Sequence, residues 1–174
     1  MRRPLFSFSS LTLVLLTNAG IPLLPISLGK PVIAVPVSTT QDRRNEAIRL
    51  NGIGLQQYNQ GRFREALETF ERALAFAKEI GDQALYGTTL YNIGSVYVSL
   101  GQYSKALDFY NQALAIAKEV GDQALYGKSL NNIGFVYRNL GQYAKALEFL
   151  NQALAFAKEI GDQAGYGTIL GSIG

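Results

Sequence analysis

The residue types that most often do chemistry are sparse in this sequence. Neither Cys nor His occurs among the 174 residues, which excludes thiolate nucleophiles, the usual zinc ligand sets and the best proton-transfer side chain near neutral pH. Three carboxylates share one helical stretch and suggest acid–base work: Glu65, Glu68 and Glu71. Because Arg62 and Arg72 are interspersed with them, a solvated, ion-paired face is the favoured interpretation.

Glycine and charge do not indicate a phosphate or nucleic-acid site either. Among 18 glycines, the one followed by Lys-Ser, at 127–129, lacks the upstream glycine of a phosphate loop. Three of the 16 basic residues lie in the first 30 positions, which leaves 13 against 13 acidic residues downstream. This neutral body lacks a basic stripe. The sequence therefore predicts no catalysis, no metal, no cofactor and no nucleic-acid partner.

The glycines instead mark a repeat of 40 residues, seen in the spacing of Gly54, Gly94 and Gly134. Residues 87–126 and 127–166 are identical at 28 of 40 positions, and each copy contains two amphipathic stretches of helical period. Gly121 and Asp122 provide a left-handed C-terminal residue and the next N-cap. These signals predict helix pairs at 43–60 with 63–80, 83–100 with 103–120 and 123–140 with 143–160, plus a stub from 163.

The repeated pattern resembles the tetratricopeptide repeat at nine positions: Leu90, Ile93, Gly94, Tyr97, Gly101, Tyr103, Ala106, Tyr110 and Ala113. The resemblance implies an all-α fold, a right-handed α-solenoid of antiparallel helix pairs with three full repeats and a partial fourth. The repeats would span 47–80, 87–120, 127–160 and from 167. The period is similar to that of the subclass in Pins-type scaffolds, kinesin light chains and exported cyanobacterial arrays. The tyrosines at 97, 103, 137 and 143 follow the core period, so we expect them to pack.

The first forty residues differ from the repeats. Arg2 and Arg3 precede an apolar run with prolines, which is typical of an export signal with a cleavage site at Ala34 or, earlier, at Ala19. An uncleaved membrane anchor and a disordered leader are the alternatives, and the paired arginines weakly resemble a twin-arginine signal. We therefore expect a signal or anchor at 1–34, a linker at 35–42 and the array at 43–174, exported to the periplasm or beyond.

Positions that differ between the copies, all but the pair Thr89 and Ser129, share one face of the first helix in each pair. At 100° per residue the variable positions span about 100°, while the identical apolar residues fill the other side. In the tetratricopeptide family this free face is a concave groove that holds peptides. The resemblance thus implies a binding surface of Asn51, Leu55, Tyr58, Thr88, Tyr91, Asn92, Ser95, Val98, Lys128, Asn131, Asn132, Phe135 and Arg138. The alternative is a solvated face under little constraint.

Two of these residues have a specific expected role. Asn92 and Asn132 occupy the position at which related arrays carry an asparagine ladder that bonds a peptide backbone, and an amide both donates and accepts. The alternative is that each Asn bonds only the neighbouring helix. Lys128 and Arg138 make one end mildly basic, which suggests a weak preference for acidic peptides.

The last helical stretch stops early in its repeat, at Ser172-Ile173-Gly174. Repeat arrays need capping elements, so the expectation is a fragment, a truncated product or an array completed by another chain, with self-association as one consequence. The leading functional hypothesis is a scaffold that binds a protein or an extended peptide. The alternative is the recognition region of a larger exported enzyme, such as a peptidase.

Overall fold

The computed structural model describes residues 39–173, and every element in this part of the chain is helical. The seven helices are α1 (Thr40–Asn59), α2 (Phe63–Ile80), α3 (Gln83–Ser99), α4 (Tyr103–Val120), α5 (Gln123–Asn139), α6 (Tyr143–Glu159) and α7 (Gln163–Ile173). The all-α prediction is confirmed, and the predicted helix pairs are present. The expected export signal at 1–34 lies outside the described residues and stays a prediction.

The first helix begins three residues before its predicted start because of a capping box. The backbone N–H of Asp42 donates to Thr39 Oγ1 at 3.1 Å, and Asp42 Oδ2 accepts from the Thr39 backbone N–H at 2.9 Å. Two otherwise unpaired donors are satisfied in this way. The bond from the Thr39 backbone also lowers the pKa of Asp42. The last residues of the predicted linker, from Thr40 on, are therefore helical.

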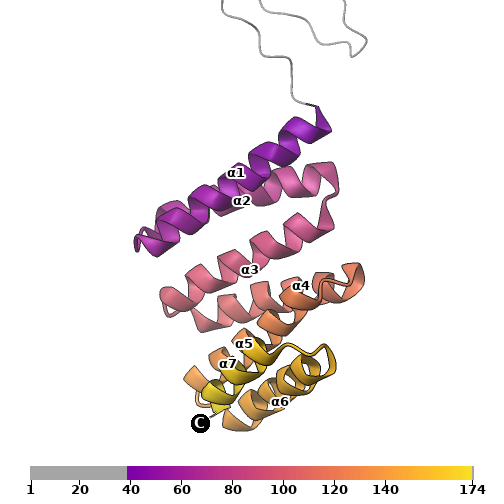
Figure 1. Ribbon diagram of the computed structural model, residues 1–174. Helices are drawn as coiled ribbons and strands as arrows, with labels where there is room; N and C mark the ends of the chain where they lie inside the picture. The colour runs from indigo at the N-terminus through magenta and orange to yellow at the C-terminus, as the bar shows by residue number, and fades with distance from the viewer. Residues whose placement is uncertain (1–38, 174) are drawn as a thin grey trace, which may run out of the picture. The chain divides into compact units, whose positions relative to one another are not determined.

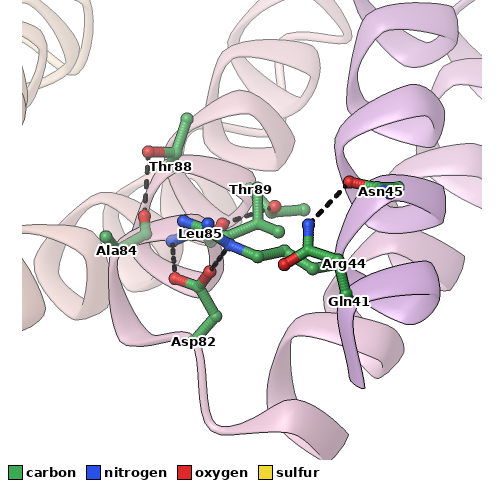
Figure 2. Close-up of polar contacts among 8 residues, drawn as sticks. All are labelled: Gln41, Arg44, Asn45, Asp82, Ala84, Leu85, Thr88 and Thr89. Carbon is green, nitrogen blue, oxygen red and sulfur yellow. Dashed lines mark hydrogen bonds and ion pairs between the residues drawn. The ribbon is translucent and has the colours of Figure 1, made fainter. Parts of the chain in front are cut away.

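The later pairs begin with an aspartate cap, as the sequence predicts. Asp82 Oδ1 accepts from the Leu85 N–H at 3.0 Å, and the equivalent bond from Leu125 to Asp122 is 2.9 Å long. Figure 2 shows that Asp82 also forms an ion pair with Arg44 of α1, in which Arg44 Nε donates to Asp82 Oδ2 at 2.7 Å. The Leu85 bond is the main cause of the lowered pKa of Asp82. One side chain thus caps α3 and ties it to the preceding pair.

Each pair packs on the next, and the odd-numbered helices do so on one side (Figure 1). Besides the contacts between consecutive helices, α1 contacts α3, α3 contacts α5 and α5 contacts α7. The even-numbered helices make no corresponding contact with one another within residues 39–173. Since the odd-numbered helices lie closer together, they form the inner face of a curved stack. The variable face identified from the sequence belongs to these helices.

Close approach within each pair depends on one glycine. A Cβ on Gly94 would lie 2.8 Å from the ring of Tyr110, and one on Gly54 would lie 2.5 Å from the ring of Phe70. At Gly134 the distances would be 2.6 Å to Leu150 Cγ and 3.2 Å to a backbone oxygen of α6. The 40-residue glycine period therefore records where a large side chain of the second helix lies directly on the backbone of the first.

The core continues from pair to pair. Phe70 of α2 clusters with Ile93 and Val96 of α3, and Tyr110 of α4 clusters in the same way with residues of α5. Each large side chain thus fills the gap inside its own pair and the gap to the next. Because every pair buries apolar side chains of its neighbour, the repeats stabilise one another as in other solenoids.

One packing expectation is wrong. Tyr143 is 67% exposed, although Tyr103 at the equivalent place in the preceding copy packs against the core cluster of α4 and α5. The cluster against which Tyr103 packs includes Ile133 and Val136 of α5, whereas the described part of α7 ends at Ile173, the equivalent of Ile133. Within residues 39–173 no helix has the length and hydropathy needed to cross a membrane.

Two glycines with opposite surroundings provide a matched test of this packing. We expect Gly134→Ala to destabilise the array by about 1 kcal/mol or more, because overpacking costs about 1–3 kcal/mol and outweighs the helix propensity of alanine. Gly52 is exposed in α1 with nothing within 4 Å of its Cβ position. There we expect Ala to stabilise by about 0.5–1 kcal/mol. Thermal unfolding followed by circular dichroism distinguishes the two, and equal midpoints would contradict the close approach.

Candidate functional site

The inner face carries a cavity of about 530 Å³ that spans the first three helix pairs. It receives side chains from α1, α2, α3, α4 and α5, and none of them is charged. The lining residues are Leu55, Tyr58, Asn59, Phe70, Tyr91, Asn92, Ser95, Val98, Tyr110, Asn132 and Phe135. Its walls are therefore aromatic and aliphatic, with amide and hydroxyl groups between them.

The structure brings most of the sequence-predicted surface together in this one cavity, hereafter the inner cavity. Eight of the thirteen predicted residues line it: Leu55, Tyr58, Tyr91, Asn92, Ser95, Val98, Asn132 and Phe135. Two more, Lys128 and Asn131, line a second cavity between α5, α6 and α7. The 40-residue spacing thus places equivalent side chains of successive copies next to one another in space.

Three predicted residues lie outside both cavities. Asn51 is buried, and its amide donates to Thr89 Oγ1 at 2.8 Å, so it joins α1 to α3 and is not part of an open surface. Thr88 is exposed and donates to the Ala84 carbonyl at 2.9 Å. Arg138 lies over the ring of Phe135 and donates to the Ser172 carbonyl at 2.8 Å. The Arg138 guanidinium thus contacts Phe135 and Ser172 beside the inner cavity and does not line it.

Sequence reasoning missed three residues of the inner cavity. Tyr110 is one of the nine repeat positions, and Phe70 is its equivalent in the first copy. The structure shows that each fills the core with its ring and also reaches the cavity. The signal that could have found them is the difference between Tyr110 and Leu150 at one position of otherwise similar copies. Asn59 lies at the end of α1 and had no distinguishing pattern.

A hydrogen-bond network orients the polar groups of the inner cavity. Asn132 Nδ2 donates to the hydroxyl oxygens of Tyr91, at 2.9 Å, and Tyr110, at 3.1 Å. Ser95 Oγ donates to the Tyr91 carbonyl at 3.1 Å, so the 3.0 Å contact between Ser95 Oγ and the Tyr110 hydroxyl uses the tyrosine proton. Among the bonds of the described residues, none uses the hydroxyl proton of Tyr91. That proton remains available for a ligand.

The two asparagines expected to contact a peptide form hydrogen bonds within the protein through their amide nitrogens only. Asn92 Nδ2 donates to Asn51 Oδ1 at 3.3 Å, and Asn132 Nδ2 bonds the two tyrosines. The amide nitrogens therefore bond neighbouring helices, which was the alternative role. Neither amide oxygen accepts a bond from any residue that the structure describes. Both oxygens belong to residues that line the inner cavity, where a peptide N–H is a suitable donor.

Burial governs the ionisation of the tyrosines in the inner cavity. It raises the pKa of Tyr91 and raises the pKa of Tyr110 further, since removal from water disfavours a phenolate. The hydrogen bond from Asn132 acts in the opposite direction at both residues but is the smaller effect. Both hydroxyls are thus protonated donors at physiological pH.

The carboxylates considered as acid–base candidates do not form a site. Glu65 is exposed and ion-paired with Arg62, and this hydrogen bond lowers the pKa of Glu65. A general acid requires a raised pKa. Glu68 and Glu71 are exposed as well. Within residues 39–173 no cluster of acidic side chains could hold a metal ion.

The profile of the tetratricopeptide repeat family matches residues 46–119 and 124–174. The chain belongs to the tetratricopeptide repeat family. The matched ranges include α2, α3, α6 and α7, all but one residue each of α4 and α5, and most of α1. This family assignment thus covers the part of the chain that forms the inner cavity. No curated protein sequence matches this tetratricopeptide chain.

Solved structures share the fold. The tetratricopeptide domain of Arabidopsis FLU is 21% identical, with a TM-score of 0.64 over 67% of this chain and 98% of that one. A putative kinesin light chain from Podospora anserina is 16% identical, with a TM-score of 0.61 over 73% of this chain and 63% of that one. Aspartyl phosphate phosphatase F from Bacillus subtilis is 22% identical, with a TM-score of 0.70 over 73% of this chain. The matched region is 33% of that phosphatase.

The buried tyrosines predict a loss of stability at alkaline pH. In the unfolded chain a tyrosine ionises near pH 10, whereas Tyr110 in the fold keeps its proton. Above that pH the unfolded state binds fewer protons, so the free energy of unfolding falls as pH rises. Tyr110→Phe should lose less stability than the parent between about pH 9 and about pH 11. Urea denaturation at both pH values measures this, and equal losses would show that Tyr110 ionises normally in the fold.

Proposed function

We propose that this chain is a non-catalytic scaffold that binds an extended peptide segment of a partner protein in the inner cavity. The observation that carries the proposal concerns Asn92 and Asn132, which line an uncharged, aromatic-walled cavity and whose amide oxygens accept no bond from a described residue. Amide oxygens accept from peptide N–H groups whatever the side chains are, while aromatic walls contact apolar side chains. The Tyr91 hydroxyl supplies a donor for a peptide carbonyl.

The chemistry of the inner cavity supports binding over catalysis. Its lining has no charged group, and the pKa values of the Tyr91 and Tyr110 hydroxyls are raised by burial. A nucleophile or base needs a lowered pKa or an adjacent proton acceptor. The second candidate, the recognition region of a larger exported enzyme, is compatible with the same cavity because recognition is the role proposed for it. A longer reading frame past residue 174 would favour that candidate.

The absence of charge in the inner cavity also predicts which part of a partner enters it. Burying an unpaired charge is costly, so we expect the segment that fills the cavity to be neutral, with apolar side chains. Any preference for acidic residues would arise outside the cavity, where Arg138 lies beside Phe135. Equal affinity of a peptide and its Asp- and Glu-neutralised version would remove the acidic preference and leave the rest of the proposal unchanged.

The proposed location is outside the cytoplasmic membrane. This rests on Arg2, Arg3 and the apolar run that follows them. Fractionation of cells that express the full chain tests it, and recovery in the cytoplasm alone would contradict it.

Peptides selected from a random display library on the 174-residue chain test the binding mode. We expect Asn92→Ala combined with Asn132→Ala to weaken a selected peptide at least about tenfold, because two hydrogen bonds of about 1 kcal/mol each are lost. Asn111→Ala is the matched control, since Asn111 is an exposed asparagine of α4 outside both cavities. Isothermal titration calorimetry gives the affinities. Equal affinity of the double variant and the control would contradict the proposed backbone recognition.

A further inference from the structure

A second cavity of about 340 Å³ lies between α5, α6 and α7, and it shares no lining residue with the inner cavity. Its walls are largely apolar and include Phe156, Ala153 and Ala157 of α6 and Ile169 of α7. Its volume is within the range of small-molecule sites, about 300–1,000 Å³. We call it the α5–α7 cavity.

The α5–α7 cavity exists because one leucine of the repeat is a glycine here. At the preceding junction, between α3, α4 and α5, Leu125 is buried and lies on Gly87, whose Cβ position is 3.1 Å from Leu125 Cδ2. Forty residues on, the equivalent of Leu125 is Gly165. A Cβ on Gly127, the equivalent of Gly87, would meet only the ring of Phe156, at 3.5 Å. The space that a leucine side chain fills at one junction is therefore open at the next.

A second departure from the repeat leaves a polar atom unpaired beside this space. At the junction of α1 and α3, the amide of Asn51 donates to Thr89 and accepts from Asn92. Asn131 is the equivalent of Asn51 two copies later. The residues equivalent to Thr89 and Asn92 are there Ile169 and Ser172.

Asn131 Oδ1 is buried and accepts no hydrogen bond from any described residue, and Asn131 lines the α5–α7 cavity. A buried acceptor without a donor costs about 1–3 kcal/mol, so the site favours a ligand that supplies a donor.

We propose that the α5–α7 cavity binds a small neutral molecule that has an apolar body and one hydrogen-bond donor. The apolar body takes the place of the missing leucine side chain against Phe156 and Ile169, and a turn of the Asn131 amide toward the cavity brings its buried Oδ1 to the donor. The lining carries one positive side chain, Lys128, and one negative side chain, Asp162, so it does not select a charged ligand. This inference is independent of the peptide site, because the two cavities have different linings.

Indole and N-methylindole are suitable probes for the full 174-residue chain. Both have the same apolar rings, but only indole has an N–H donor. Backbone amide NMR shifts during a titration locate the site and give the dissociation constants. We expect the shifts to gather in α5, α6 and α7, with indole binding about fivefold more tightly than N-methylindole because of one added hydrogen bond.

Gly165→Leu should abolish the indole shifts in α5–α7 while leaving the helical circular dichroism unchanged. A Cβ at position 165 would meet Asp162 Oδ2 at 2.2 Å, but the side chain of Asp162 can move, since Asp82 and Asp122 cap the helix next to a leucine at the same position. Asn131→Leu is the second variant and keeps the cavity. It should bind indole and N-methylindole with equal affinity.

The outcomes separate the two parts of the proposal. Absence of saturable shifts up to the solubility of indole, or shifts gathered at the inner cavity, would overturn the α5–α7 site. Equal binding of the two probes by the parent chain would overturn the role of Asn131. If Gly165→Leu does not fold, the Asn131→Leu comparison alone still decides whether the donor is recognised.

Discussion

The close contact between a glycine of each odd-numbered helix and a large side chain of the next helix determines the rest of the structure. Gly54 lies against Phe70, Gly94 against Tyr110 and Gly134 against Leu150, each with less room than a Cβ needs. With the helices of a pair this close, the same large side chain also reaches the following pair. The contact inside a repeat is thus also the contact between repeats, which explains how one short unit can extend into an array.

This arrangement also separates packing from recognition. The odd-numbered helices pack through the apolar side that is identical between copies, and they present the side that differs between copies to the inner face. Tyr110 connects the two roles, because its ring lies on Gly94 while its hydroxyl bonds Ser95 and Asn132 in the inner cavity. The recognition groups are therefore positioned by the core and do not depend on mobile loops, which favours preorganised binding.

Much of this could be predicted from the sequence because the repeat supplies its own comparison. Helix pairs, caps and turns followed from the period. Four residues of the inner cavity followed from differences between copies, and the family resemblance supplied Leu55, Tyr58, Asn92 and Asn132. The hydrogen bonds did not. Asn51 was predicted to face a ligand, yet it bonds Thr89 between α1 and α3. Whether a side chain faces a ligand or the neighbouring helix depends on a rotation of a few tens of degrees about the helix axis. An arc of 100° is too wide to tell these two directions apart. The α5–α7 cavity was also missed, although Gly165 and Ile169 both depart from the repeat, because the last copy was treated as an incomplete stub.

The account depends most on a guest segment lying along the odd-numbered helices. Photo-crosslinking with a selected peptide tests this directly, with benzoylphenylalanine introduced in place of Leu55 on α1 or of Asn111 on α4. Leu55 is 43% exposed and lines the inner cavity, whereas Asn111 is exposed outside it. The account predicts efficient crosslinking from position 55 and little from position 111. Crosslinking from position 111 with none from position 55 would contradict it.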